Sequence, residues 1–97
     1  MNVKLLRIVT GEEVLAELIS EDENTVTIQN GLVVLPSANG VGFAPWATVI
    51  SKEKREITLS REHLVYMVEC DEDVQKKYES IFGGTNLITP DKKKLIL

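Results

Sequence analysis

Apolar and polar side chains alternate with a period of two through much of the first half of the chain. Val14, Ala16 and Leu18 fall on one face of an extended segment, and they alternate with Glu13, Leu15, Glu17 and Ile19. Residues 10–12 and 21–24 interrupt the pattern with short, turn-forming stretches. This arrangement predicts an antiparallel meander. We expect its first three strands at residues 3–9, 13–20 and 25–29.

Asn30-Gly31 has two interpretations. Asn-Gly is a strong signal for a two-residue hairpin turn. Alternatively, the pair forms a bulge that bends one long strand running from residue 25 to residue 35. Residues 32–35 are apolar on both faces, which favours the bend, because they would continue a strand that changes sheets.

The second half of the chain is expected to continue the sheet and then to form a helix. Pro45 disturbs the fourth strand because proline cannot donate a ladder hydrogen bond. Three carboxylates at residues 71–73 favour a helix start, and Gly83-Gly84 favours its end. An apolar stripe lies between them, at Val74, Tyr78, Ile81 and Phe82. We therefore expect a turn at 36–40, a strand from 41, a charged loop at 51–56, strands at 57–59 and 63–70, and a helix at 71–82.

The length of 97 residues suits one domain, and no apolar run reaches the roughly 20 residues that cross a bilayer. Residues 1–9 lack the pattern of a secretory signal. Cys70 is the single cysteine, so no internal disulfide is possible. These features predict a cytoplasmic protein without a membrane partner, in a reducing compartment.

Several expected strands are apolar on both faces. Val3 and Leu5 point one way while Leu6 and Ile8 point the other. A small barrel has one interior, so the second apolar face must be covered by the helix, the tail or another subunit. We expect a homo-oligomer.

Charge is unevenly distributed. Residues 1–50 carry two basic and six acidic side chains, whereas residues 51–97 carry nine of each. Nucleic-acid binding usually depends on a basic surface, so the acidic first half counts against it.

Few residues could carry chemistry. His63 is the single histidine and, with Cys70, points to opposite faces of an expected strand, so the two form no catalytic couple. The acidic side chains fit a solvated surface better than a metal site, and no zinc pattern occurs. Trp46 fits a core position better than a base-stacking platform. Lys52, Lys54 and Arg55 are typical of a solvated loop, with phosphate contact as the alternative. We expect no enzyme activity, no cofactor and no metal.

Two stretches resemble the Sm and Sm-like (LSm) proteins. Residues 3–18 (VKLLRIVTGEEVLAEL) are similar to the opening of the family's first motif, and Asp22 matches its loop aspartate. Residues 59–67 (LSREHLVYM) are similar to its second motif, in which an apolar residue and a basic turn precede the final strand. The sequence is most similar to members encoded by phages, particularly cyanophages, and the cytoplasm would then be that of the host cell.

The chain also departs from that family at several positions. Ala16 stands where Gly is usual, and Thr25 and Val26 replace the Met and Asn that help to hold a uridine. Ser60-Arg61 stands in place of Arg-Gly. The family's N-terminal helix is missing, and the helix at 71–82 is added.

The resemblance implies a mainly β fold: a small, strongly bent, five-stranded antiparallel barrel of the Sm-like (SH3-type) kind over residues 1–70. Residues 71–97 would supply one helix and a tail that pack on the barrel or on a neighbouring subunit. It also implies a homo-oligomeric ring of five to seven copies that binds single-stranded RNA through loops facing the pore. Transferred position by position, the RNA-binding residues are Asp22, Asn24, Thr25, Ser60, Arg61 and His63.

Arg61 is the single cation in those loops, facing Glu21, Asp22, Glu23 and Glu62. The alternative is therefore a structural or adaptor ring that binds protein partners and no nucleic acid.

Overall fold

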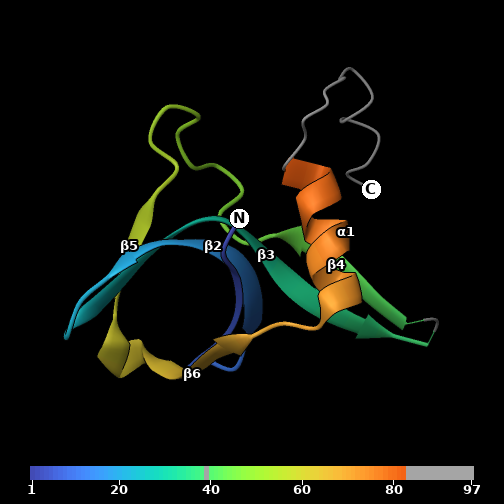
Figure 1. Ribbon diagram of the computed structural model, residues 1–97, viewed down its shortest axis with the longest axis horizontal. Helices are drawn as coiled ribbons and strands as arrows, with labels where there is room; N and C mark the ends of the chain where they lie inside the picture. Colours follow the sequence, from blue (N-terminus) through green and yellow to red (C-terminus); the bar gives the residue numbers. More distant parts are fainter. Residues whose placement is uncertain (39, 83–97) are drawn as a thin grey trace.

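The structure is a computed structural model that describes residues 1–38 and 40–82, and it is mainly β with one helix (Figure 1). The mainly β content and the helix agree with the sequence-based prediction, whereas the expected barrel is not found, because the strands form an open sheet. The elements, in chain order, are β1 Val3–Ile8, β2 Glu13–Glu21, β3 Thr25–Ser37, β4 Gly40–Pro45, β5 Ile57–Ser60, the 3₁₀ turn η1 Arg61–His63, β6 Leu64–Glu69 and α1 Glu72–Phe82.

The strands form one antiparallel sheet in the order β4-β3-β2-β1-β6, with β5 also paired to β3. β3 holds two partners because its start, Thr25–Ile28, pairs with β5 and its end, Leu32–Ser37, pairs with β4. The sheet curls (Figure 1) but is not closed, since η1 and not a ladder joins β5 to β6. The five strands implied by the resemblance are wrong, because residues 46–56 separate β4 from β5 and both of these strands pair with β3. What the ladders form is an open six-stranded sheet.

The bend in β3 lies at Asn30-Gly31, so the single-strand interpretation is correct and the hairpin is wrong. Asn30 has a left-handed backbone (φ 56°), and β3 has one more residue than β2 between the pairs Leu15–Leu32 and Glu17–Gln29. Such a bulge bends and twists a strand. A Cβ added at Gly31 would lie 3.3 Å from both the Trp46 ring and Val14, so a larger residue there would require these side chains to shift.

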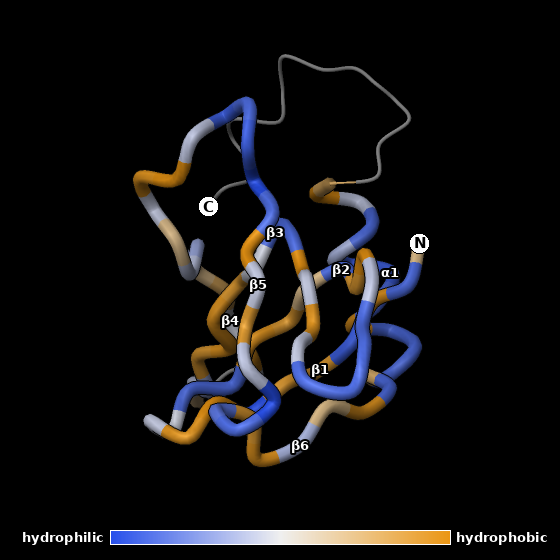
Figure 2. The backbone as a smooth tube through the Cα atoms, turned by 90° about the vertical axis from the view of Figure 1, so that its left-hand side faces the viewer, coloured by the Kyte–Doolittle hydropathy of each residue, from blue (hydrophilic) through white to orange (hydrophobic). Residues whose placement is uncertain are grey.

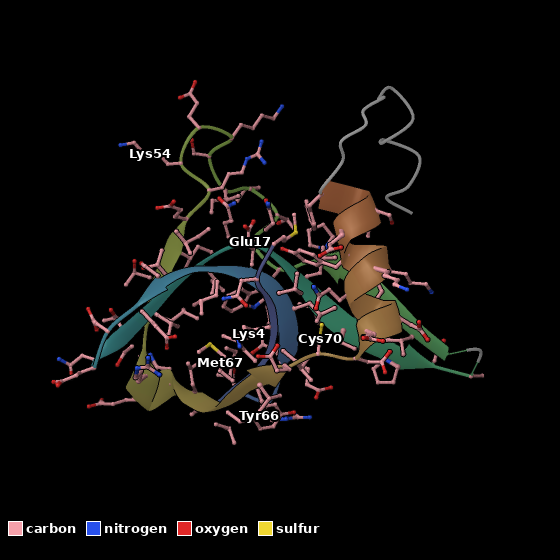
Figure 3. The ribbon with its side chains drawn as sticks, viewed as in Figure 1. Lys4, Glu17, Lys54, Tyr66, Met67 and Cys70 are labelled. Atoms are coloured by element: carbon pink, nitrogen blue, oxygen red, sulfur yellow. The ribbon has the colours of Figure 1, made fainter. Side chains whose placement is uncertain are left out.

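Two hydrophobic clusters occupy the two faces of the sheet. The inner cluster lies within the curl and contains Leu6, Ile8, Val14, Ala16, Leu18, Val26 and Ile28. The outer cluster lies between the sheet and α1 and contains Val3, Leu15, Leu32 and Tyr78. Figure 3 shows Met67 pointing into the curl, Tyr66 pointing away from it and Cys70 beside the helix.

The helix α1 covers part of the outer face. Asp71 lies just before it and accepts hydrogen bonds from the backbone amides of Asp73 (3.0 Å) and Val74 (3.3 Å), as an N-cap does. The expected apolar stripe packs on the sheet, and the Tyr78 hydroxyl donates to the backbone carbonyl of Asn30 (2.7 Å). The Tyr78 and Phe82 rings lie 4.9 Å apart. A helix too short to be stable alone is therefore held by tertiary packing.

Element ends differ from the expectations by a few residues. β3 extends through Pro36 to Ser37, so the turn is shorter than residues 36–40, and β6 begins at Leu64 because His63 belongs to η1. The expected helix end at Gly83-Gly84 and the tail lie outside the described residues. No helix in the described part of the chain has the length and hydrophobicity to span a membrane.

Candidate nucleic-acid interface at the β2–β3 loop

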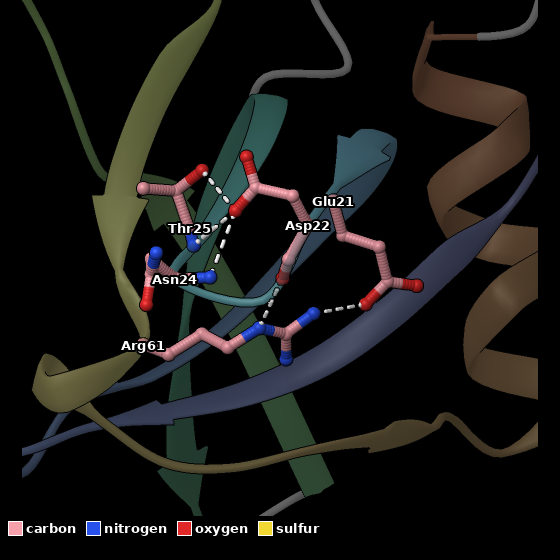
Figure 4. Close-up of polar contacts among 5 residues, drawn as sticks. All are labelled: Glu21, Asp22, Asn24, Thr25 and Arg61. Carbon is pink, nitrogen blue, oxygen red and sulfur yellow. Dashed lines mark hydrogen bonds and ion pairs between the residues drawn. The ribbon is translucent and has the colours of Figure 1, made fainter.

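Five of the six expected RNA-binding residues meet at one corner of the fold, and Figure 4 shows Asp22, Asn24, Thr25 and Arg61 there, together with Glu21. The loop between β2 and β3 supplies Asp22, Asn24 and Thr25, and the β5–η1 junction supplies Ser60 and Arg61. The ladder between β3 and β5 brings these segments together, because it pairs Thr25 with Ser60. Residues almost forty positions apart thus form one local structure.

Asp22 holds the loop in shape. One of its carboxylate oxygens accepts hydrogen bonds from the backbone amides of Asn24 and Thr25, both at 2.8 Å, and from the Thr25 hydroxyl at 3.1 Å. Bonds to the ionised carboxylate, first from Asn24 and then from Thr25, lower the pKa of Asp22 below its ordinary value. The aspartate that matches the family motif therefore acts here as a turn-forming residue.

Arg61 fastens the two segments to each other. Its backbone amide donates to the Asn24 carbonyl (2.9 Å), and its Nε donates to the Asp22 carbonyl (2.7 Å). One terminal nitrogen forms an ion pair with Glu21 at 2.5 Å. The guanidinium is thus already engaged within the chain, and it is half-exposed.

Ser60 and His63 have different surroundings. The Ser60 hydroxyl accepts from the Glu62 amide (3.2 Å) and begins η1. The His63 carbonyl accepts from the Val9 amide (2.8 Å), while its exposed imidazole makes no hydrogen bond to any described residue. The His63 side chain therefore takes no part in the hydrogen bonds that join the other five residues.

The charge of the corner is acidic. Glu21, Asp22, Glu23 and Glu62 are exposed around Arg61, and Arg61 is bonded to two of these residues. A phosphate group would have to displace Glu21 or face the unpaired carboxylates. The corner can accept hydrogen bonds far better than it can bind an anion.

A second polar cluster, which the sequence analysis missed, lies across β1, β2 and β6. Arg7 forms an ion pair with Glu13 (3.2 Å), the Tyr66 hydroxyl donates to Glu13 (2.7 Å), and the Arg7 guanidinium lies 5.8 Å from the Tyr66 ring centre. The bond to Tyr66 is the main reason why the pKa of Arg7 is raised. Knowledge of the strand registers would have revealed this cluster, because Arg7 pairs with Glu13 in one ladder and with Tyr66 in another.

The remaining candidates are structural. Trp46 packs against the inner cluster. The pKa of the Glu12 carboxyl is lowered mainly by its hydrogen bond with Thr10 and, to a smaller degree, by that with Trp46. Burial raises the pKa of the Cys70 thiol, which packs beside α1. In the described residues, no group of three or more histidine, cysteine or acidic side chains could hold a metal ion.

The corner built around Asp22 and Arg61 is therefore a hydrogen-bonded turn, and five of the residues transferred from the family motif contribute to it. Its chemistry is that of a rigid, acidic loop. Comparisons with protein-family models and with curated proteins give no match to this chain.

Proposed function

We propose that this chain is a self-assembling module of the Sm-like type, in which identical copies join edge to edge into a closed ring of five to seven subunits. One observation carries the proposal: the curled sheet is open, and both strands at the opening, β5 and β6, have one unpaired edge among the described residues. The curl of the sheet and the short η1 turn before the last strand also agree with the family's order of elements.

The two edges carry few of the charged residues and prolines that prevent strands from pairing with other molecules. Natural edge strands are usually protected by lysine, proline or other charged residues. β5 has none of these, and β6 has one acidic residue at its end, Glu69, which is tied to Lys4 at 2.6 Å. The edge strand β4, in contrast, ends in Pro45 and contains two glycines. β5 and β6 are therefore the edges best suited to pair.

Pairing between two different edges is head-to-tail, so each copy uses both and the chain of contacts closes into a ring or continues as a filament. A ring leaves no bare edge. Val65 and Val68 of β6 are 59% and 45% exposed, and their coverage by a neighbour would add hydrophobic stabilisation.

Size-exclusion chromatography with light scattering tests the assembly. We expect the protein to have a molar mass several times 10.8 kDa at micromolar concentration. Val65→Lys should convert it to a folded monomer, because a charge on a pairing edge opposes assembly. Val41→Lys is the matched control, since Val41 is a similarly exposed valine on the edge strand β4. A monomeric parent protein, or dissociation by Val41→Lys instead of Val65→Lys, contradicts the proposal.

For the role of the ring, the geometry favours a structural or adaptor module that binds protein partners. The expected RNA loops would repeat their acidic residues around the pore, and Arg61 is already bonded to Glu21 and Asp22. Such a pore would repel phosphate.

Single-stranded RNA binding is the second candidate, and it is favoured by the convergence of Asp22, Asn24, Thr25, Ser60 and Arg61 at one corner. Fluorescence anisotropy with oligo-U across a salt series separates the two roles. The adaptor role predicts no saturable binding even at low salt. Saturable binding that weakens with salt and is lost in Arg61→Gln would establish the RNA role instead.

A further inference from the structure

The loop at residues 47–56, between β4 and β5, projects away from the sheet (Figure 1). It carries Lys52, Lys54 and Arg55, together with Glu53 and Glu56, and all five are exposed. The ion pairs among the described residues join Lys4 to Glu69, Arg7 to Glu13 and Arg61 to Glu21, so none includes a cation of this loop. The loop therefore has a net charge of +1 on an acidic protein, and its cations are in none of these ion pairs.

Local hydrogen bonds hold the loop in shape. The Ser51 hydroxyl accepts from the amides of Glu53 (3.1 Å) and Lys54 (3.3 Å), and Arg55 Nε donates to the Lys52 carbonyl (3.2 Å). Figure 3 shows Lys54 pointing away from the rest of the molecule. The cations are therefore presented outward.

The same loop exposes apolar side chains. Val49 is 94% exposed and Ile50 is 36% exposed, and Figure 2 shows an apolar stretch followed by a hydrophilic one in the loop that precedes β5. Beneath it is a mainly apolar hollow of about 300 Å³, whose lining includes Leu32, Trp46 and Ile57. Val49 and Ile50 therefore add apolar surface beside the cations of the loop.

The corner where β6 passes into α1 has the opposite charge. Residues 69–73 contain Glu69, Asp71, Glu72 and Asp73 and no cation, and all four are exposed. Glu69 is paired with Lys4 and Asp71 caps α1, whereas the carboxylates of Glu72 and Asp73 make no hydrogen bond or ion pair with any described residue. Val68, 45% exposed, adds an apolar contact beside them.

The two surfaces lie apart within one copy (Figure 1), but the proposed assembly would bring them together. Every ladder in the described sheet is antiparallel, and purely antiparallel sheets are over-represented. If β5 pairs antiparallel with β6 of the next copy, the start of β5 lies beside the end of β6. The basic loop precedes β5 and the acidic corner follows β6, so they become neighbours.

We infer that the loop at residues 47–56 docks on the β6–α1 corner of a second copy, with Lys54 and Arg55 facing Glu72 and Asp73, so that a charge contact reinforces each strand-pairing contact. This inference rests on the proposed edge-to-edge assembly. It adds a charged contact that orients each copy relative to the next and makes the assembly sensitive to salt. Exposed ion pairs are weak singly, but the contact is repeated at every subunit boundary.

Charge reversal tests the contact, with the dissociation constant of the assembly measured by analytical ultracentrifugation at low salt. Lys54→Glu/Arg55→Glu should raise that constant about tenfold, since two attractions become repulsions. Glu72→Lys/Asp73→Lys should act likewise, and the two reversals combined in one chain should restore assembly. The effect should shrink at ~0.5 M salt, where charges are screened.

Lys76→Glu/Lys77→Glu is the control, because it changes the net charge of the protein by the same amount on the helix surface. Equal weakening by this control and by Lys54→Glu/Arg55→Glu, or no restoration in the combined variant, overturns the contact. If the contact is wrong but the assembly is correct, the parent protein still assembles and Val65→Lys still dissociates it. If the assembly itself is wrong, the parent protein sediments as a monomer at every salt concentration.

Discussion

The two hydrophobic clusters differ in what encloses them. The inner cluster is surrounded by the sheet itself, and Leu6 and Val14 at its centre have no exposed surface. The outer cluster is covered by one short helix, and Tyr78 is its main side chain from that helix. Val68, which pairs with Leu5 of β1, is not covered by α1 and stays 45% exposed. The sheet thus completes one core alone, whereas the other depends on an added element and is incomplete near β6.

This difference predicts that the inner cluster sets the stability of the whole domain and that the outer cluster can be weakened locally. Local opening is typical of elements with few buried contacts. The following changes test that division, beginning with the one of largest expected effect.

Leu6→Ala should lower the free energy of unfolding by about 3 kcal/mol, because it leaves a cavity in the enclosed cluster. Urea unfolding at one fixed protein concentration measures it. Leu5→Ala is the matched control on the outer face, where the side chain is half-buried, and it should cost about 1 kcal/mol. Equal losses for the two leucines would show that the clusters are not distinct.

Tyr78→Phe should cost about 1–2 kcal/mol, because the Asn30 carbonyl loses a 2.7 Å hydrogen bond in a buried place. Burial, and then the charge of Glu17, raises the pKa of Tyr78. The folded protein therefore keeps its phenol proton where the unfolded chain would lose it.

This raised pKa gives the pH dependence a definite sign. Stability should fall as pH rises above about 10, the ordinary tyrosine pKa, and Tyr78→Phe should flatten that decline. Urea midpoints between pH 8 and 11 provide the check. If stability falls as steeply with rising pH in Tyr78→Phe as in the parent protein, Tyr78 is not the cause of the decline.

Asp71→Ala should cost about 1 kcal/mol by removing the cap of α1. Hydrogen exchange should show faster exchange in α1 and unchanged protection of β1 and β2. Asp71→Asn, which keeps a capping oxygen, should preserve most of the stability. Equal loss of protection in the inner strands would contradict independent weakening of the outer region.

Asp22 is expected to give the smallest effect. Its lowered pKa means that its contribution to stability is present above about pH 3.9, the value of an unperturbed aspartate, and is lost as pH falls through the lower folded-state pKa. An NMR titration of the carboxyl carbon should show this directly. A pKa at or above the ordinary value would mean that the amide bonds from Asn24 and Thr25 are absent in solution.

Local patterns in the sequence were sufficient for much of the fold. The period of two located β1 and β2, and the carboxylates at 71–73 with the apolar stripe located α1 within one residue. The resemblance to the Sm-like family, and not these patterns, brought Asp22 and Arg61 into one hypothesis, because it placed them in neighbouring loops. These signals work because they depend on neighbours in the chain.

The state of the site depended on partners distant in sequence. Arg61 is bonded to Glu21 across 40 positions, and no local pattern reveals that its guanidinium is occupied. The Arg7–Glu13–Tyr66 cluster likewise requires the registers of two ladders.

What the sequence alone determined is which side chains are apolar on which face and where the chain turns, because alternation and turn chemistry are local. Only the tertiary structure decided that β3 bends at Asn30 and does not reverse, since Trp46 and Tyr78 pack against that bend from other elements. It also decided which face α1 covers and that β5 and β6 keep bare edges. Those outcomes depend on the free energy of contacts between distant segments.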